Sequence, residues 1–454
     1  MSWDPVRDLD AAAKLGEILR DAGYTEDAIV ERLGDDGPAA DVEEVPVLDR
    51  RLGHDELDNL IRLLLLHLPI RKAEIPGVKE LAALNFVAEV DGAVLPQGRI
   101  VPTDGVYLAF DGFSVGLADP PGWVASYTPT SFWLASLTPR PHGRRAVDVG
   151  TGNGAHALFA ARHMDHVIAT DINARALDFT AIGTALNGMA NVETRQGSLF
   201  DPVAGETFDL ITCNAPYVVS PESRWQYRDA GERGDSFSER AVREAAAHLA
   251  DGGYATLTAS WLGKSEDDPD DHIHAWLDGS GCDTWVNPIR GADPLDHAAG
   301  WTDHLTADAV GPALDAWASY LAELGAGWVT EGVVVLHKRA GTRHLVFAEP
   351  VEEDDLEDGG AQAVRVLSNL ALLAEGEYRR MRFRLVKNAW FREELDVEGD
   401  VTDVTLMLDE GTQPELEIEP EEIDALVDPK GFTLESVGDE LLRAVLELGF
   451  AKPF

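Results

Sequence analysis

Apolar residues in the first part of the chain recur at helical spacing. Residues 8–33 are expected to form two short helices that end at Gly23 and Gly34, because glycine commonly terminates helices. Between Asp55 and Leu68, leucines and isoleucines lie three and four positions apart, which predicts a third helix. The N-terminal segment is therefore expected to be mainly helical.

The pattern changes to alternation after a further predicted helix near residues 78–86. The run VAEVDGAVLP alternates around Asp91-Gly92, which is typical of a two-residue hairpin turn. Helices followed by a hairpin predict an α+β, winged-helix-like domain over residues 1–124. Such modules often bind nucleic acid, but basic residues are few here, and we expect a packing or partner-docking domain instead. Its few basic residues include Arg71, Lys72 and Lys79.

From about residue 125 to 342, short apolar runs alternate with helical patterns. The expected strands lie in the runs RAVDVG, VIATD, FDLITCN, YATLTASW, CDTWVNPI and WVTEGVVVLHK. The expected helices cover residues 155–164, 174–186, 236–249 and 307–324. Strands that alternate with helices predict an α/β domain with a parallel, doubly wound sheet.

The remainder, residues 343–454, is expected to form a small, acidic α+β domain. It opens with the acidic linker EPVEEDDLEDGG and closes with a helix over residues 434–448. The run YRRMRFRLVKNAWFREE mixes arginine with aromatic residues, a combination that suits contact with RNA. The alternation across MRFRLV within it also fits an edge strand with charges on the exposed face, and we favour that interpretation.

Charge and composition narrow the class of protein. The 454 residues include 37 Lys and Arg against 81 Asp and Glu, and the net charge of −44 repels nucleic-acid backbones at long range. This charge fits either adaptation to high salt or an ordinary solvated acidic surface. No apolar run reaches the ~20 residues of a membrane span, the N-terminus lacks a secretory pattern, and two cysteines cannot build a disulfide framework. We expect a cytoplasmic protein, and the sequence does not specify its oligomeric state.

The first chemical motif is the glycine-rich run DVGTGNG, from Asp148 to Gly154, which follows a predicted strand. Glycines let the backbone approach a ligand closely, and the next helix offers free N–H groups. Asp171 ends the next predicted strand, about 20 residues further on, where a carboxylate accepts both hydroxyls of a ribose. The two features predict a ribose-containing cofactor without separating nicotinamide cofactors from other nucleosides.

The motif Asn214-Ala215-Pro216-Tyr217 argues against a nicotinamide cofactor, because an enzyme that transfers hydride has no use for these residues at this position. It follows the strand FDLITC, at the carboxyl edge where open sheets hold ligands. An amide or exocyclic amine nitrogen is a poor nucleophile, and two carbonyl oxygens that accept its N–H bonds orient it and stabilise its growing positive charge. An aromatic ring stacks on the planar acceptor group. The motif therefore indicates methyl transfer to nitrogen.

Five segments of the chain resemble, in this order, the release-factor glutamine methyltransferases and their small-domain relatives: DVGTGNG, ATDINARAL, GSLFDPV, FDLITCNAPYV and RDAGERGDSF. The resemblance covers about residues 125–265, and the flanking domains resemble those of an actinobacterial-type group of predicted methyltransferases. It implies a class I, Rossmann-like fold that uses S-adenosylmethionine. It also implies a protein substrate, a glutamine of a release-factor-like protein, in preference to RNA.

The resemblance carries roles over to individual residues. Those that match cofactor-binding positions are Asp148, Gly150, Thr151, Gly152, Gly154, Asp171, Ile172, Ser198, Leu199 and Asn214. Those that match acceptor-binding positions are Asn214, Pro216 and Tyr217. Within the first set, Asp148 supports the glycine loop, Asp171 is the ribose ligand and Ile172 packs on adenine. Ser198 and Leu199 match the contacts to the adenine edge.

Departures from the family leave alternatives open. Ala215 stands where the family has proline, whose fixed φ stiffens the loop, and Ser198 stands where the family usually has Asp. A non-catalytic cofactor-binding module is one rival interpretation, and N-methylation of an exocyclic amine of an RNA or DNA base is another. The turn at Arg233 matches a loop near the peptide substrate and is equally well explained as an ordinary turn.

The remaining candidate residues have simpler interpretations. No metal site is expected, because His272 and His274 flank no cysteine cluster. His156 and His163 lie on one predicted helix without an acidic partner, so we expect solvated or core side chains. Cys213 lies within a strand and is expected to act as a small buried hydrophobe.

Overall fold

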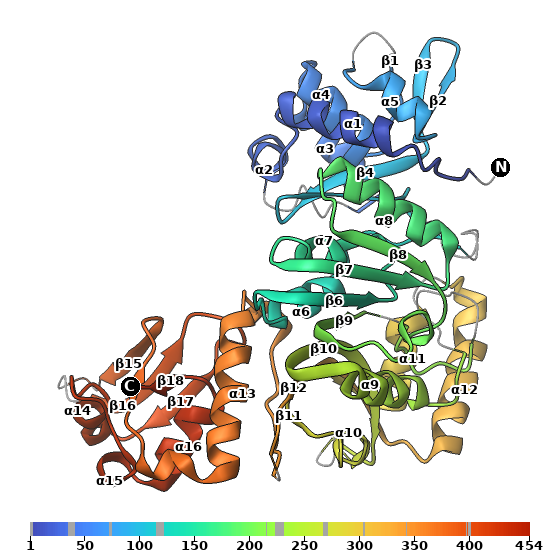
Figure 1. The fold of residues 1–454 in the computed structure, drawn as a ribbon. Helices are drawn as coiled ribbons and strands as arrows, with labels where there is room; N and C mark the ends of the chain where they lie inside the picture. Colours follow the sequence, from blue (N-terminus) through green and yellow to red (C-terminus); the bar gives the residue numbers. More distant parts are fainter. Residues whose placement is uncertain are drawn as a thin grey trace.

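The computed structural model describes most of the chain. The N-terminal part lies above the central part in Figure 1, and the C-terminal part lies beside the lower half of the central part. The described residues are 3–34, 41–71, 75–114, 122–214, 216–222, 231–266, 271–302, 305–341, 343–395, 397 and 401–454. Ala215, where the sequence departs from the family, and Arg228 to Ala230 of the last matching segment lie outside this set.

The N-terminal part is mainly helical, as the apolar spacing predicts. Its helices are α1 (Leu9–Asp21), α2 (Glu26–Leu33), α3 (Val45–Leu48), α4 (Glu56–Leu60) and α5 (Val78–Ala83), with a π-helical turn at Ile61–Leu65. Asp8 and Thr25 accept hydrogen bonds from backbone N–H groups and so cap α1 and α2. The predicted boundaries at Gly23 and Gly34 are confirmed within one or two residues.

Two hairpins complete this part. The strands are β1 (Ile70–Arg71), β2 (Val87–Val90), β3 (Ala93–Pro96), β4 (Gly98–Thr103) and β5 (Val106–Asp111). The predicted β2–β3 hairpin turns at Asp91 and Gly92, and both have the positive φ that its two-residue turn requires. The β4–β5 hairpin is not predicted, and β5 packs on α8 of the central part. The likeness to a winged-helix module stays a prediction.

An eight-stranded sheet forms the middle of the molecule, in the order β13-β11-β12-β10-β9-β6-β7-β8. The strands are β6 (Gly143–Val149), β7 (Met164–Asp171), β8 (Val192–Gln196), β9 (Phe208–Cys213), β10 (Leu249–Gly263), β11 (Cys282–Ala292), β12 (Trp328–Lys338) and β13 (Val346–Ala348). The strands β6 to β10 pair in parallel, whereas β12 runs antiparallel to β10 and β11. The doubly wound α/β fold is confirmed, and the expectation of a wholly parallel sheet was wrong at β12, because an apolar run does not encode strand direction.

Helices cover both faces of this sheet (Figure 1). They are α6 (Pro129–Leu137), α7 (Ala155–Ala160), α8 (Ala174–Leu186), α9 (Ser236–His248), α10 (Asp271–Leu277), α11 (Pro294–Thr302) and α12 (Ala307–Leu324). Val333 and Val335 of β12 share a core with α6, while Val334 and Leu336 share one with α9 and α10. Burial on both faces explains why this strand reads as a continuous apolar run.

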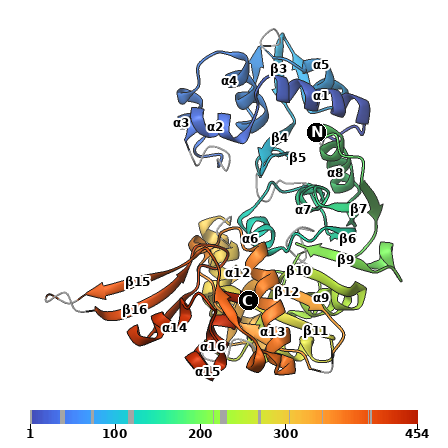
Figure 2. The same cartoon turned by 60° about the vertical axis from the view of Figure 1, so that its left-hand side comes forward.

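The C-terminal part packs beside the sheet through α13 (Gly360–Glu375), and Trp133 of α6 lies in the same core as Leu367 and Leu370. Its other elements are β14 (Phe383–Leu385), β15 (Ala389–Leu395), β16 (Val401–Leu408), β17 (Glu415–Ile418), α14 (Ile423–Leu426), α15 (Leu434–Val437), α16 (Asp439–Glu447) and β18 (Ala451–Pro453). The predicted single closing helix was wrong, because Gly438 separates α15 from α16. The hairpin of β15 and β16 extends away from the body (Figure 2).

The arginine-rich run is divided between a 3-10 turn (Glu377–Arg380) and the two strands β14 and β15. The alternating residues predicted as an edge strand form β14, which pairs with β18 in a two-stranded sheet. β15 lies at the edge of a three-stranded sheet, where Arg392 pairs with Glu415 at 2.9 Å and Trp390 donates to Asp409. Acidic neighbours therefore neutralise part of its positive charge.

The order of the strands determines where a ligand fits. From β6 the chain moves outward through β7 and β8, then returns to the other side of β6 as β9. Strand order reverses at this point, and the diverging connections leave a crevice at the carboxyl ends of β6 and β9. In the described part of the chain, no helix is long and apolar enough to span a membrane.

Candidate functional site

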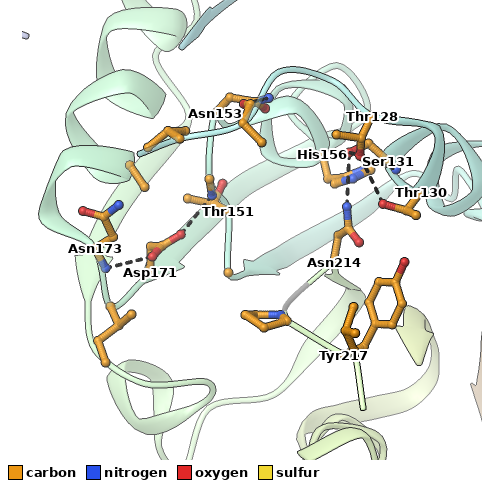
Figure 3. A pocket seen from close by; sticks show the side chains of 18 of the residues that line it. Thr128, Thr130, Ser131, Thr151, Asn153, His156, Asp171, Asn173, Asn214 and Tyr217 are labelled. Carbon is orange, nitrogen blue, oxygen red and sulfur yellow. Dashed lines mark hydrogen bonds between the residues drawn. The ribbon is translucent and has the colours of Figure 1, made fainter. Parts of the chain in front are cut away.

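A cavity of about 590 Å³ opens at these carboxyl ends, and most of the predicted site residues line it (Figure 3). Those that do are Gly150, Thr151, Gly152, Asp171, Ile172, Ser198, Leu199, Asn214, Pro216 and Tyr217. Asp148 and Gly154 do not line it. The predicted residues therefore come together in one crevice, with two of them behind its wall.

Asp148 lies beneath the glycine turn and shapes it. Its side chain is buried, and Oδ2 accepts hydrogen bonds from Thr151 Oγ1 at 2.6 Å and from the backbone N–H of Ala157 at 3.2 Å. Oδ1 accepts from Thr212 Oγ1 at 2.8 Å. This carboxylate joins the turn to α7 and to β9, which is a supporting role.

Gly150, Gly152 and Gly154 of the turn all have positive φ, and the last two show what glycine contributes. Gly152 has φ of 56° and no atom within 4 Å of the place a Cβ would occupy, so its backbone faces the open cavity. Gly154 has φ of 86°, and a Cβ there would lie 3.0 Å from Thr180. Both glycines have a left-handed backbone conformation, which residues that carry a Cβ atom rarely adopt.

Asp171 is fixed by the backbone around it. Oδ2 accepts the N–H of Gly152 at 2.9 Å, and Oδ1 accepts the N–H of Asn173 at 2.8 Å. Burial raises the pKa of this carboxyl group, while the two N–H bonds act against that rise. Each carboxylate oxygen keeps a further lone pair for a ligand. The next side chain, Ile172, is 58% exposed and offers an apolar surface beside the carboxylate.

Asn214 follows β9 at the other end of the cavity and is held on both sides. Its Nδ2 donates to Ser131 Oγ at 3.1 Å (Figure 3), and its Oδ1 accepts from Thr258 Oγ1 at 2.8 Å. One N–H and one lone pair of the amide stay available. An acceptor next to a donor complements a second planar group that carries both, such as an amide.

The sequence reasoning missed Ser131 and Thr258. Ser131 lies in the first turn of α6, where Thr128 caps the helix and bonds to Ser131 at 3.1 Å. The Thr128-Pro129 pair is a helix-start signal that could have located α6. Nothing in the sequence links α6 or β10 to Asn214, because they lie 83 and 44 residues away.

Tyr217 forms a fixed wall at this end. It is 9% exposed and packs with Ala298 and Trp317 of α11 and α12. Figure 3 shows its ring beside Asn214, with the hydroxyl turned toward Thr130. Burial raises the pKa of this phenol well above its usual value, so it stays neutral.

The segment before α6, residues 122–128, forms one wall of the cavity, which we call the roof. Asn173 and Asn153 donate to the carbonyls of Gly122 and Ala125, each at 3.1 Å. Asp111, at the end of β5, accepts the N–H of Val124 at 2.9 Å. The roof is therefore anchored to both the central sheet and the N-terminal part, a contribution that the local motifs do not signal.

Charged side chains lie near the opening. The turn at Arg233, which resembles a loop near the peptide substrate, contributes Glu232 to the cavity lining but not Arg233 itself. Glu232 forms an ion pair with Arg240. Arg290 also lines the cavity and pairs with Glu353 at 2.7 Å. Within the described ranges, no group of three His, Cys, Asp or Glu residues is placed to hold a metal ion.

Comparison with known proteins finds similarity in the segment that contributes most of the cavity-lining residues. The family model "Methyltransferase small domain" matches residues 128–264. A release factor glutamine methyltransferase of Xylella fastidiosa is 35% identical over 130 residues, which are 26% of this chain and 47% of that protein. A ribosomal protein uL3 glutamine methyltransferase of Bradyrhizobium diazoefficiens is 35% identical over 123 residues, 24% of this chain and 39% of that protein. The match thus spans less than half the length of these relatives.

Solved structures with similar chains include a methyltransferase from Pyrococcus furiosus and the tRNA m1G37 methyltransferase of M. jannaschii. The first is 19% identical with a TM-score of 0.30, covering 51% of this chain and 90% of that one. The second is 12% identical with a TM-score of 0.32, covering 54% of this chain and 58% of that one.

Proposed function

We propose that this chain methylates the amide nitrogen of a protein glutamine with S-adenosylmethionine as donor. The match of residues 128–264 to the methyltransferase small-domain model supports this proposal. The observation that carries the proposal is the held amide of Asn214 in the same cavity as the Gly152 turn and Asp171. One end of the cavity suits a nucleoside and the other suits a planar nitrogen.

The donor end fits S-adenosylmethionine in its shape and in its chemistry. Each oxygen of Asp171 retains a lone pair, which suits the two hydroxyls of a ribose. Ile172 presents an exposed apolar surface for a purine, and Ser198 and Leu199 line the cavity beside it. Gly152 leaves open space for the methionine part, and the bound donor would supply an activated methyl group there.

At the acceptor end, Asn214 would hold the substrate amide through two hydrogen bonds. Its free Oδ1 lone pair accepts an N–H of the substrate, and its free N–H donates to the substrate carbonyl. Ser131 and Thr258 fix the direction of the Asn214 amide before the substrate arrives. A dipole held in place stabilises the positive charge that grows on the nitrogen without reorganising during the reaction.

Tyr217 and Pro216 would complete the acceptor site by confining the planar group. The buried tyrosine ring cannot swing away, because α11 and α12 pack behind it. A confined amide is held in line with the methyl donor, and such positioning supplies much of the rate of a bimolecular reaction.

A protein substrate fits this chain better than RNA. The net charge of −44 opposes a phosphate backbone, and the arginine-rich strand is partly neutralised by Glu415. The matched relatives are named as methyltransferases of release factors and of ribosomal protein uL3. We therefore propose a glutamine in a protein of the translation machinery, and a cytoplasmic location.

Transfer of a radioactive methyl group tests the proposal. The purified chain is incubated with S-adenosylmethionine labelled with tritium in its methyl group and with release factor or uL3 from the same source. We expect protease-sensitive label, with mass spectrometry placing one methyl group on a glutamine. RNase-sensitive label would instead support the nucleobase alternative. Calorimetric binding of the donor with no transfer to any cell fraction would support the non-catalytic module.

A further inference from the structure

His156 is a buried residue that the family match gives no role. It lies in the first turn of α7 with only 6% of its surface exposed, and its Nε2 has no hydrogen-bond partner. It lines the main cavity and also a second, small cavity of about 20 Å³. Among the described residues that line these two cavities, His156 alone lines both.

The ring lies at the acceptor end of the main cavity. Figure 3 shows His156 beside Ser131, on the side of the cavity from which Ser131 holds the Asn214 amide. Asp148 is the charged group of β6 that acts on the ring, and Arg140 and His163 line the small cavity. Burial lowers the pKa of His156, so the imidazole is neutral near pH 7 and one ring nitrogen carries a lone pair.

The small cavity has the size and polarity to hold water. One water molecule needs about 10–15 Å³ and several polar partners. Thr138 and Thr212 line the cavity, and each hydroxyl already donates its proton, to Leu134 O and to Asp148 Oδ1 respectively. Their oxygens would therefore accept hydrogen bonds from a water molecule in this cavity, which His156 also lines.

We propose that His156 takes the proton released during methylation and passes it to water in the small cavity. The inference rests on the proposed function. The acceptor nitrogen forms a bond to the methyl carbon, and the carbon–sulfur bond breaks with its electron pair left on sulfur. The nitrogen loses one proton to the imidazole, which then gives a proton to the water behind it. The products are the N-methyl amide, the thioether and one proton in solvent.

Loss of the sulfonium charge during transfer favours proton uptake by His156. Before transfer, a positive sulfonium near the ring makes the imidazolium less favourable and holds the ring neutral. As the methyl group moves, the sulfur becomes neutral and the basicity of the ring rises. The imidazole is thus free to accept a proton when the nitrogen must lose one.

The first test compares rates in the wild type, His156→Gln and the control His166→Gln, in which the substituted residue is exposed on β7 and pairs with Glu193. We expect His156→Gln to lower kcat by about 100-fold near neutral pH, the lower end of general-base contributions. The fall of wild-type kcat at acidic pH, as His156 becomes protonated, should be absent in this variant. Unchanged kcat and pH profile in an active enzyme would overturn the inference, whereas an inactive wild type would count against the proposed function.

The second test needs no methyl acceptor and remains decisive if the variant folds poorly. The wild-type protein with isotope-labelled histidine is titrated by NMR with S-adenosylmethionine and with S-adenosylhomocysteine. We expect the positive sulfonium to lower the pKa of His156 relative to the neutral thioether, and His166 to show no difference. Equal His156 pKa values in the two complexes would overturn the inference, because the ring would then lie away from the reacting centre.

Discussion

The two ends of the cavity are built in different ways. At the donor end, Asp171 is held by the backbone N–H groups of Gly152 and Asn173, within one stretch of sequence. At the acceptor end, Asn214 is held by the side chains of Ser131 and Thr258, which come from α6 and β10. The donor end is thus a local structure, whereas the acceptor end exists only when distant elements have packed together. Substitutions at the two ends should therefore affect different quantities.

The largest expected effect is at the acceptor end. Asn214→Ala removes the preorganised amide and should lower the methyl-transfer rate by about 100- to 1000-fold, as the loss of one such group commonly does. The affinity for S-adenosylmethionine, measured by calorimetry, should stay nearly unchanged. The control is Asn388→Ala, whose exposed side chain bonds to Glu410 in the C-terminal part. If Asn214→Ala lost its affinity for S-adenosylmethionine, the assignment of Asn214 to the acceptor end alone would be contradicted.

The acceptor end also contains a buried carboxyl group, that of Glu331, next to the cavity-lining residue Trp301. Glu331 of β12 accepts a hydrogen bond from Trp301 at 3.0 Å, and burial raises its pKa to about 7 from 4.5. Between these pH values the unfolded chain releases this proton before the folded protein does, so stability falls as pH rises. Glu331→Gln should therefore raise the free energy of unfolding above pH 7 by roughly 3 kcal/mol.

Denaturant unfolding at several pH values checks this prediction. The difference between Glu331→Gln and the wild type should disappear below pH 4.5, where the carboxyl group is protonated in both states. A difference that is independent of pH would show that Glu331 is not buried in the way described.

At the donor end, the expected change is in binding. Asp171→Ala should weaken the affinity for S-adenosylmethionine by about 5- to 150-fold, which corresponds to the roughly 1–3 kcal/mol of hydrogen bonds to a charged group. Because burial raises the pKa of Asp171, wild-type affinity should fall as pH falls through that pKa, and Asp171→Asn should remove this dependence. Calorimetry at several pH values measures both effects, with Asp165→Asn on the exposed side of β7 as the control. A wild-type affinity that does not vary with pH would argue against a carboxylate ligand.

The smallest expected effect concerns the side chains that hold Asn214. Ser131→Ala and Thr258→Val each remove one hydrogen bond, worth about 0.5–1.5 kcal/mol, and should lower kcat by roughly 2- to 10-fold. In the Asn214→Ala background, neither should lower the rate further, because the amide they orient is absent. Additive losses in the double variants would mean that the two residues act by another route.

The difference between the two ends also explains what the sequence could predict. The glycine turn, Asp171 and the strand before each were located because turn, strand and ligand group are neighbours in sequence. Asn214 was located by its own motif, but its partners Ser131 and Thr258 were not, because only tertiary packing brings them close. The segment before α6, which Asp111 anchors through the N–H of Val124, and the antiparallel direction of β12 were missed for the same reason.

The central claim is that the two ends face each other across one ligand, and a crystal structure with S-adenosylhomocysteine tests it directly. We predict that the ribose hydroxyls bond to Asp171 and that the sulfur points toward Asn214 within the span of a methyl group and a bound amide. A nucleoside bound with its ribose away from Asp171, or with its sulfur turned from Asn214, would contradict the account.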